Sequence, residues 1–348
     1  MKNIILNSRN SNIKIGNNTT IKVNCNIGVN SKREYNSELR KVDLILKDDD
    51  IKPDIMMDLS TLDTKSPLYK YIYQNYSIPV GTVPCYSFKS FNKNSILEQL
   101  HEQAEAGVAF YTLHFTANKN LLNLAKKSRI IPTTSRGGGI MLRNQSNKTE
   151  NILLSIIDEI IEIALKFDIA ISLGSTFRPA TIFDALDEVH SEETAQQLKI
   201  CKYLQDRNVK VIVENIGHIE LHKLEQHKEE LNKFHAPIMP LGPLPTDSAI
   251  GLDHIASAVG ASFSAYWGVA HIINAITPIE HSNAIIDIEN TRIGLKTAKL
   301  VAHILNLQKS EIDRLKDLKI TETRAKYQSC MNNYSGCDRC SNYCPLNL

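Results

Sequence analysis

Residues 168–214, DIAISLGSTFRPATIFDALDEVHSEETAQQLKICKYLQDRNVKVIVE, contain the pattern that decides the fold. Two short apolar runs, Asp168–Gly174 and Val209–Glu214, flank an amphipathic stretch at Phe183–Asp206. A buried strand, a helix and a second buried strand form a βαβ unit, whose two strands lie parallel in one sheet. This part of the chain therefore predicts a parallel sheet covered by helices.

The same alternation continues along most of the chain. Nine runs have the character of strands, which is one more than an eight-stranded barrel holds. The weakest is Ile130–Arg136, because it contains Pro132 and follows only a short basic segment; we interpret it as a long loop that ends in Ser-Arg-Gly-Gly-Gly. Eight strands remain, and they predict a (β/α)8 TIM barrel, with a doubly wound open sheet as the alternative. The other predicted strands are Ile21–Gly28, Asp54–Ser60, Val80–Tyr86, Ala109–His114, Ile238–Gly242 and His271–Thr277, and the other predicted barrel helices are Ser95–Ala106, Thr149–Phe167 and Glu220–Phe234.

The order of these elements divides the chain into four parts. We predict a short N-terminal extension at 1–19, the barrel at 20–290, a small helical appendage at 291–328 and a cysteine-rich tail at 329–348. The appendage contains two helical stretches, at about Thr291–Leu307 and Ser310–Lys326.

Composition and charge narrow the class of protein. The chain has 40 Lys+Arg against 38 Asp+Glu, which gives no electrostatic reason to expect nucleic acid or a membrane surface as a partner. It lacks an apolar stretch of eighteen residues, and its first residues do not have the apolar core of a signal peptide. We therefore expect a soluble cytoplasmic protein.

Four of the seven cysteines lie in the last nineteen residues. Cys337, Cys340 and Cys344 form a C-x2-C-x3-C triplet, a cysteine run of the kind that holds iron–sulfur clusters. With Cys330 as a fourth ligand, the same residues would instead make a closed cluster or a four-cysteine zinc site. Spacing alone leaves cluster and zinc equally favoured.

Polar side chains gather where the predicted strands end. Because barrel enzymes place catalytic residues at the carboxyl ends of their strands, these side chains are expected at one barrel mouth. Helix capping explains small polar residues in such places, but it explains several histidines, a glutamate and two arginines less well. The residues are Asn24, Asn26, Met57, Asp58, Tyr86, His114, Ser135, Arg136, Arg178, Glu214, His218 and His281.

Two histidines at the mouth are candidate metal ligands. Gly217 permits a tight turn that presents His218 to the mouth, and His281 follows the last strand. Together they predict a divalent metal site with positions left open for water or substrate. The alternatives are that each is an ordinary surface histidine, or that His218 pairs with His222 four residues later on a helix.

Two cations at the mouth suit an anionic ligand. Ser135–Gly139, SRGGG, is interpreted as a glycine-rich loop whose N–H groups could cradle a phosphate, or else as a flexible turn. Arg178 could fork onto a phosphate, or else lie solvated at the surface. Asp247 and His254, between the last two predicted strands, are interpreted as helix-capping residues.

Several motifs together resemble one enzyme family. ISLGSTFRPATIFDALDE (171–188), VIVENIGHIELH (211–222), APIMPLGPLPTDSAIGLDHIASAVGA (236–261) and ITPIEH (276–281) look like the thiamin pyrimidine synthase, or phosphomethylpyrimidine synthase, family. VNCNIG, MMDLST, PVGTVPCY, HEQAEAGVAFYTLHF and TSRGGGIM resemble it too. The resemblance runs in consistent order from about residue 21 to residue 302 and includes the tail.

This resemblance implies a (β/α)8 barrel and a homodimer in which each cysteine tail reaches over the partner's barrel. It implies a radical S-adenosylmethionine enzyme whose [4Fe-4S] cluster, held by three cysteines, binds the cofactor and yields a 5′-deoxyadenosyl radical after one-electron reduction. That radical rearranges 5-aminoimidazole ribotide into hydroxymethylpyrimidine phosphate, in the pathway to thiamine. An electron donor such as flavodoxin or ferredoxin is expected, and the protein positions and shields the radical.

Family roles carry over where motifs match. The resemblance implies a divalent metal, zinc or iron, on His218 and His281, and cluster ligation by Cys337, Cys340 and Cys344, which leaves Cys330 as a spare thiol. Glu214 and Arg178 are the residues we expect to be catalytic. The implied substrate-binding residues are Asn26, Met57, Tyr86, His114, Ser135, Arg136, Gly137, Arg178 and Glu214.

The chain also departs from the family pattern. Ser175 stands where the family has a substrate-facing aspartate, Met239 where it has a tyrosine, and Asn215-Ile216 where it has Gly-Pro. These changes bear on the substrate and product more than on the radical chemistry. Two alternatives follow: a paralogue that converts the same ribotide to another product, such as 5-hydroxybenzimidazole for the cobamide lower ligand, or a non-catalytic paralogue that binds metal or ribotide.

Overall fold

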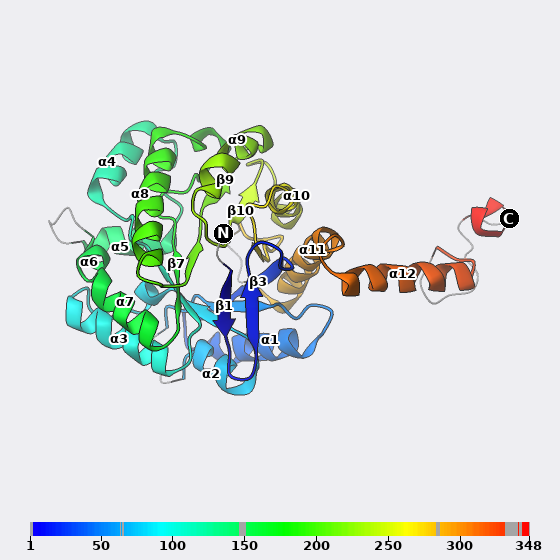
Figure 1. Ribbon diagram of the computed structural model, residues 1–348, viewed down its shortest axis with the longest axis horizontal. Helices are drawn as coiled ribbons and strands as arrows, with labels where there is room; N and C mark the ends of the chain where they lie inside the picture. Colours follow the sequence, from blue (N-terminus) through cyan, green and yellow to red (C-terminus); the bar gives the residue numbers. More distant parts are fainter. Residues whose placement is uncertain are drawn as a thin grey trace.

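A curved parallel sheet forms the centre of the molecule (Figure 1). The structure, a computed structural model, describes residues 3–62, 64, 66–145, 151–282, 286–330, 340 and 343–347. Seven strands pair in the order β11-β3-β4-β5-β6-β7-β8, and every pair is parallel. Their bounds are β3 Lys22–Ile27, β4 Ile55–Asp58, β5 Val80–Thr82, β6 Phe110–Leu113, β7 Ala170–Leu173, β8 Val211–Val213 and β11 Ile272–Asn274.

A short extended segment, Pro237–Met239, closes this sheet into a barrel. On one side Val213 N donates to Pro237 O and Met239 N donates to Val213 O, both at 2.9 Å. On the other side His271 N donates to Ile238 O, also at 2.9 Å. The segment thus pairs with both edge strands and serves as the eighth strand. The predicted TIM barrel is confirmed, and the open doubly wound sheet is excluded because both edges are joined.

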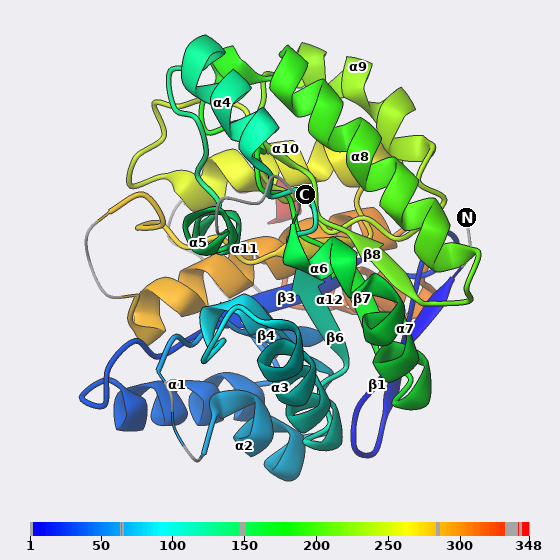
Figure 2. The ribbon, with the colours of Figure 1, turned by 90° about the vertical axis from the view of Figure 1, so that its left-hand side faces the viewer.

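Helices surround the barrel, as Figure 2 shows. The strand interiors are almost wholly buried, as expected for parallel strands with side chains on both faces out of water. Four of the predicted helical stretches correspond to α3, α7, α8 and α9. The bounds are α1 Tyr35–Lys47, α2 Leu68–Asn75, α3 Lys93–Glu105, α4 Lys119–Ser128, α5 Arg136–Asn144, α6 Ile152–Ser155, α7 Ile157–Lys166, α8 Glu188–Gln205, α9 Leu221–Asn232, α10 Asp253–Tyr266 and α11 Ile288–Asn306.

The segment Ile130–Arg136 is a connection rather than a strand, as expected. The interpretation of Ser135–Gly139 as a loop was wrong, because Ser135 is the N-cap of α5 and its Oγ accepts from Gly138 N at 3.0 Å. Gly137 and Gly138 are buried in the first turn of that helix. The glycines therefore belong to a capped helix start that faces the barrel mouth.

The first residues form an antiparallel hairpin, β1 Ile4–Asn7 and β2 Asn12–Ile15. Lys210 Nζ, just before β8, donates to Ile5 O, and Ser11 Oγ donates to Ser77 O, shortly before β5. These partners precede their strands, so the hairpin lies at the end of the barrel opposite the mouth. The N-terminal extension is thus a hairpin on the amino-terminal face, where barrels carry stability rather than catalysis.

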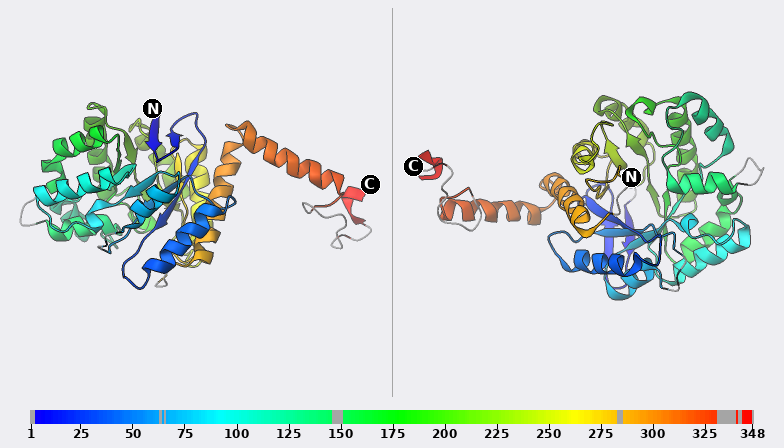
Figure 3. Two further views of the ribbon diagram at one scale, coloured as in Figure 1. Left: turned by 90° about the horizontal axis from the view of Figure 1, so that it is seen from below. Right: turned by 180° about the vertical axis from the view of Figure 1, so that it is seen from behind.

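The two C-terminal helices differ in their packing. Leu295, Ala298 and Val301 of α11 are buried in the core with β3, so α11 is the eighth barrel helix and not part of an appendage. Helix α12, Glu311–Lys326, is described in full and contains no buried residue. It projects from the barrel and carries the chain end away from it (Figures 1 and 3).

Two polar side-chain contacts reach from α12 back to α11. His303 Nε2 is 2.8 Å from Asp317 Oδ1, and His303 Nδ1 is 3.2 Å from Asp313 Oδ1. One histidine and two carboxylates one helical turn apart thus help to set the direction of the projecting helix.

Candidate active site

The predicted site residues meet at the carboxyl ends of the barrel strands. Asn26 and Met57 are register partners on β3 and β4, and His114 directly follows β6. Tyr86 ends the short helical turn η1, Pro84–Tyr86, after β5, and Glu214 follows β8. Because every strand of the barrel runs in the same direction, these positions share one mouth.

Glu214 and Arg178 form the charged centre of this mouth. Glu214 is buried, and it accepts hydrogen bonds from Thr112 Oγ1 at 2.6 Å and Ser172 Oγ at 2.9 Å. Burial raises the pKa of Glu214, while the two hydroxyls and the charge of Arg178 act against that rise. Arg178 Nη1 donates to Ser175 O at 2.9 Å, which leaves most of the guanidinium donors for other partners.

His114 is a buried polar side chain of the site. It is 4% exposed, and its Nδ1 has no hydrogen-bond partner among the described residues. Burial, with the charge of Arg178, lowers the pKa of His114 to about 3, so the imidazole is neutral. A Cβ on Gly137 would lie 2.2 Å from its ring and one on Gly174 2.9 Å, so the two glycines make room for it. A buried, unpaired nitrogen at a barrel mouth indicates a ligand contact.

Tyr86 and Arg136 form a second pair of contacting residues at the mouth. The Arg136 guanidinium stands 5.4 Å from the centre of the Tyr86 ring, and burial raises the pKa of Tyr86 to about 12. Arg136 and Asn26 both line a cavity of about 580 Å³, a volume usual for small-molecule sites. Asn26 Oδ1 accepts from Asn24 Nδ2 at 2.9 Å, which fixes its side chain within the barrel.

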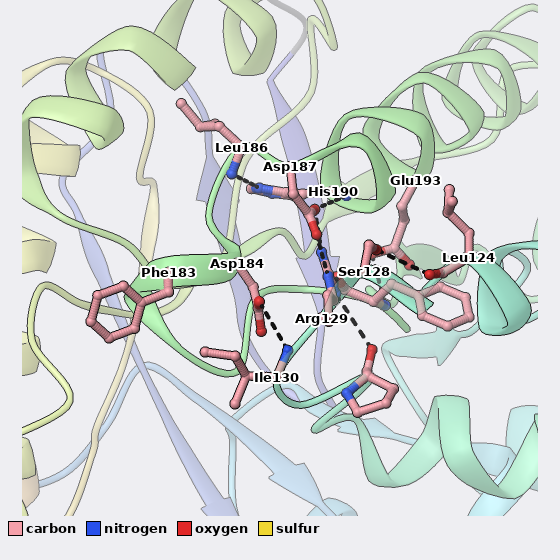
Figure 4. Close-up of polar contacts among 12 residues, drawn as sticks. Leu124, Ser128, Arg129, Ile130, Phe183, Asp184, Leu186, Asp187, His190 and Glu193 are labelled. Atoms are coloured by element: carbon pink, nitrogen blue, oxygen red, sulfur yellow. Dashed lines mark hydrogen bonds and ion pairs between the residues drawn. The ribbon is translucent and has the colours of Figure 1, made fainter. Parts of the chain in front are cut away.

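Hydrogen bonds to α8 fix the backbone of the segment that carries Arg178. Glu193 of that helix, fully buried, accepts hydrogen bonds from Thr176 N and Phe177 N. Arg129 donates to both oxygens of Asp187 at 2.7 and 2.8 Å and to Phe177 O at 2.6 Å (Figure 4). A bidentate pair and a fully satisfied carboxylate thus fix the backbone that positions Arg178.

His218 and His281 come together as predicted. Their ring centres are 5.2 Å apart and the rings are nearly perpendicular. Two imidazoles bound through nitrogen to one tetrahedral zinc, at roughly 2.0–2.1 Å, would have ring centres about 5 Å apart, so the pair fits a shared divalent ion. Among the described residues no group of three or more His, Cys, Asp or Glu is arranged to hold a metal, so this site would offer two protein ligands and open positions.

Two aspartates orient these histidines, a role that the sequence alone did not assign to either of them. Asp247 Oδ1 lies 2.6 Å from His218 Nδ1, and Asp253 Oδ1 lies 2.8 Å from His281 Nδ1. Each carboxylate is placed to accept a hydrogen bond from Nδ1–H, the tautomer that leaves the Nε2 lone pair for a metal. Burial lowers the pKa of His218, which keeps its imidazole neutral, while Asp247 acts in the opposite direction.

Two alternative interpretations of these residues were wrong. His218 belongs to the short strand β9, Ile216–His218, whereas His222 is exposed on α9, so they are not a helical pair. Asp247 lies between β10, Leu241–Leu244, and α10, and it bonds a histidine rather than capping a helix. The Asp247–His218 contact spans 29 residues, and no local pattern announces it.

The sequence matches the Radical SAM ThiC family over residues 1–344. The chain belongs to this family. Membership of a radical SAM family implies an enzyme that uses S-adenosylmethionine and a [4Fe-4S] cluster, and it confirms the resemblance noted from the motifs.

Individual relatives of this ThiC family member agree. It is 33% identical to a phosphomethylpyrimidine synthase of Carboxydothermus hydrogenoformans, over 84% of this chain and 71% of that protein. It is 31% identical to one of Caldanaerobacter subterraneus subsp. tengcongensis, over 96% of this chain and 85% of that protein. Among solved structures, dihydropteroate synthase of Yersinia pestis superposes with a TM-score of 0.52 at 12% identity, over 88% of this chain and 99% of that chain, which supports the fold alone.

The family-pattern departures have clear structural places. Ser175 is fully buried and donates to Glu193 Oε2 at 2.7 Å, so it faces α8 rather than open space. Met239 is fully buried in the segment that closes the barrel. Asn215 is buried as well, and its amide donates to Gln197 Oε1 at 2.8 Å and Thr194 Oγ1 at 3.2 Å.

The short turn η4, Pro345–Asn347, lies beyond the far end of α12, away from this chain's own mouth (Figure 3). Cys340 is exposed and Cys344 partly exposed, and both are free thiols, as is exposed Cys330. Cys337 lies outside the described residues. The donor set fits a cluster held by three thiolates in the family's C-x2-C-x3-C order.

No helix in the described parts of the chain is long and apolar enough to cross a membrane.

Proposed function

We propose that this protein is a radical S-adenosylmethionine lyase that rearranges 5-aminoimidazole ribotide to hydroxymethylpyrimidine phosphate, a step towards thiamine. The observation that carries the proposal is the convergence of His114, Arg178 and Glu214 at the mouth of a barrel that belongs to this family. Phosphomethylpyrimidine synthases at 31–33% identity align with most of the chain and support the same activity. A reaction that begins with a phosphorylated, nitrogen-rich ribotide matches a mouth that combines cations, a carboxylate and a neutral imidazole.

Each mouth residue has a role in this proposal. The capped N-terminus of α5, with Ser135, Arg136 and Gly137, receives the phosphate, because a helix start presents N–H groups and a positive dipole end. Arg178 adds a second cation. Neutral His114 forms a hydrogen bond to the ribotide through its unpaired Nδ1. Asn26, Met57 and Tyr86 shape the remainder of the pocket.

Glu214 is the residue we assign to proton handling. Its raised pKa, caused first by burial, allows the carboxyl to hold a proton closer to neutral pH than an exposed glutamate does. Thr112 and Ser172 fix its orientation, and Arg178 stabilises its ionised form. An acid group so placed can bind the amino group of the ribotide and exchange a proton with the rearranging ring.

The tail holds the cluster through Cys337, Cys340 and Cys344, and Cys330 has no part in it. When bound, the cluster and S-adenosylmethionine supply one-electron chemistry that generates a 5′-deoxyadenosyl radical. His218 and His281 bind a divalent metal, zinc or iron, through Nε2, and the open positions take water or substrate. The barrel excludes water and orients the ribotide for the radical.

The proposal includes a homodimer in which each tail serves the partner's barrel. Exposed apolar side chains support it: Ile312, Leu315 and Leu318 of α12, Tyr266 of α10 and Leu300 of α11 are each at least half exposed. Sedimentation velocity should give a dimer, and Leu315→Lys with Leu318→Lys should give monomer. A reduced cluster and unpaired thiols suit the cytoplasm, with flavodoxin or ferredoxin as electron donor.

One further product stays open. Ser175 replaces a carboxylate and Met239 a tyrosine, so the ribotide would meet a less polar mouth than the family pattern describes. These two positions favour the alternative that the same ribotide is converted to 5-hydroxybenzimidazole.

One anaerobic assay tests the proposal. Cluster-reconstituted protein is incubated with ribotide, S-adenosylmethionine and dithionite, and the products are identified by mass spectrometry. Hydroxymethylpyrimidine phosphate together with 5′-deoxyadenosine is the expected result. A benzimidazole product would replace the leading function by the alternative. If neither 5′-deoxyadenosine nor a ribotide-derived product forms, both functions are wrong and a non-catalytic binding role remains.

A further inference from the structure

Asp247 contacts two parts of the mouth at once. Its Oδ1 lies 2.6 Å from His218 Nδ1, and its Oδ2 accepts from Ile182 N at 3.0 Å. Ile182 opens the short helical turn η2, Ile182–Asp184, four residues after Arg178 on the same β7–α8 connection. One carboxylate therefore joins a candidate metal ligand to the segment that carries the central cation.

A second contact runs beside the first. His218 N donates to Pro179 O at 3.1 Å, the residue after Arg178. Gly217 adopts φ +132°, and a Cβ there would lie 2.5 Å from Pro179 O, so only glycine permits this approach. The turn that presents His218 and the segment that presents Arg178 are thus packed as one unit.

Asp253 provides a contrast within the same site. Its Oδ1 lies 2.8 Å from His281 Nδ1, and its Oδ2 accepts from the backbone N of His281 at 3.4 Å. Both oxygens serve one histidine. Asp253 orients a ligand, whereas Asp247 orients a ligand and also holds a substrate-binding segment.

We propose that Asp247 couples metal binding to ribotide binding, because it holds His218 with one oxygen and the Arg178 segment with the other. A metal on His218 Nε2 polarises the Nδ1–H group and strengthens its hydrogen bond to Asp247. The fixed carboxylate then holds Ile182 N–H and keeps Arg178 facing the mouth. Coupling of two binding equilibria is reciprocal, so ribotide also tightens the metal. This inference rests on the proposed function, in that it takes the ribotide as ligand.

Three variants separate orientation from coupling. Asp253→Asn weakens metal binding by about 10–100-fold, the usual effect of losing such a partner, but leaves the coupling in place. Asp247→Asn breaks the coupling, because the amide has an NH₂ group in place of one carboxylate oxygen, so the contacts to His218 Nδ1 and Ile182 N cannot both be kept. Ile182→Pro removes only the N–H donor. Proline fits this position because Ile182 is the first residue of a 3-10 turn, and because the extended backbone of Thr181 (ψ 156°) suits a following proline.

The test uses calorimetric titration of ribotide into metal-free and zinc-loaded or iron(II)-loaded protein, without S-adenosylmethionine or reductant. In the wild type, metal should tighten ribotide binding by about 5–150-fold, the ordinary range for coupled sites. Ile182→Pro should keep metal affinity and lose most of that factor, while Asp253→Asn should keep the factor once saturated with metal. Metal content is measured by mass spectrometry of the acid-digested protein, and thermal unfolding checks that each variant is folded.

The outcomes distinguish two failures. If the wild type binds ribotide equally well with and without metal, or if Ile182→Pro keeps the full factor, the coupling proposal is overturned and the proposed function stands. If the wild type binds no ribotide in either form, the proposed function fails and the coupling fails with it. Equal behaviour of Asp247→Asn and Asp253→Asn at metal saturation would reduce Asp247 to an orienting residue.

Discussion

Glu193→Gln is a nearly isosteric change at a buried carboxylate that holds the Arg178 segment. Its Oε1 accepts from Thr116 Oγ1 and Thr176 N, both at 2.6 Å. Its Oε2 accepts from Ser175 Oγ at 2.7 Å and Phe177 N at 2.8 Å. Four donors therefore converge on one carboxylate with no exposed surface.

The cost of the change follows from the donor count. Glutamine replaces one acceptor oxygen by an NH₂ group, and a hydroxyl can rotate to accept from it, but a backbone N–H cannot. Either Thr176 N or Phe177 N then loses its acceptor, which costs about 1–3 kcal/mol for a buried N–H. The other bonds lose their charge assistance, about 1 kcal/mol more. We expect a loss of roughly 2–4 kcal/mol in the free energy of unfolding.

The assay is urea unfolding of the metal-free protein, followed by ribotide titration of the folded variant. Glu192→Gln is the matched control, because the neighbouring side chain is exposed and such a change usually stays within about 0.5 kcal/mol. Weaker ribotide binding should accompany the stability loss, since the same bonds position Arg178. A Glu193→Gln protein as stable as the Glu192→Gln protein would refute this account of the segment.

Three further predictions address the mouth, the contact between α11 and α12, and the tail. Gly137→Ala should weaken ribotide binding at least about tenfold in calorimetry, because its Cβ would lie 2.2 Å from His114. Gly139→Ala is the control: its Cβ meets nothing closer than 3.9 Å, and the change should raise helix stability by up to about 1 kcal/mol. Equal ribotide affinities of the two variants would contradict this prediction. Hydrogen bonds to Asp317 and Asp313 raise the pKa of His303, so the contribution of His303 to folding stability is present below its unfolded pKa and is lost as the pH rises through the raised value. In urea titrations, His303→Ala should therefore destabilise the protein more at about pH 6 than at about pH 8.5. A loss of stability that does not depend on pH would argue against these hydrogen bonds. Replacing Cys337, Cys340 or Cys344 with Ala should abolish the brown colour and bound iron of anaerobically purified protein, while Cys330→Ala should retain both; loss of iron in Cys330→Ala would point to four-cysteine ligation.

The barrel and its mouth could be predicted because both follow from local rules. Runs such as Asp168–Gly174 are apolar on both faces, and helices between them force a parallel sheet. Polar residues directly after such runs, as with His114 and Glu214, must then share one end of the barrel. The arrangement needed no knowledge of distant contacts.

What sequence reasoning missed depends on contacts between distant segments. Three successive glycines favour a loop by propensity. In the structure, however, His114 occupies the space beside Gly137, and Thr176 occupies the space beside Gly138. A helix with side chains at these two positions could not pack against His114 and Thr176. Helix α10 is rich in Ala, Ser and Gly, which blurs its apolar period. Asp253, at the start of that helix, reaches His281 across 28 residues, and a capping residue has the same local sequence.

The projecting α12 has a consequence that can be measured by co-expressing two inactive variants of the chain. If each catalytic centre combines one chain's barrel with another chain's tail, two differently damaged chains can repair each other. A barrel-defective Glu214→Gln chain and a tail-defective Cys340→Ala chain, each inactive alone, would form hybrid pairs with one intact centre. Co-expressed in equal amounts, they should recover about a quarter of wild-type turnover, since random pairing makes about half the dimers hybrid. A tail that served its own barrel would restore nothing.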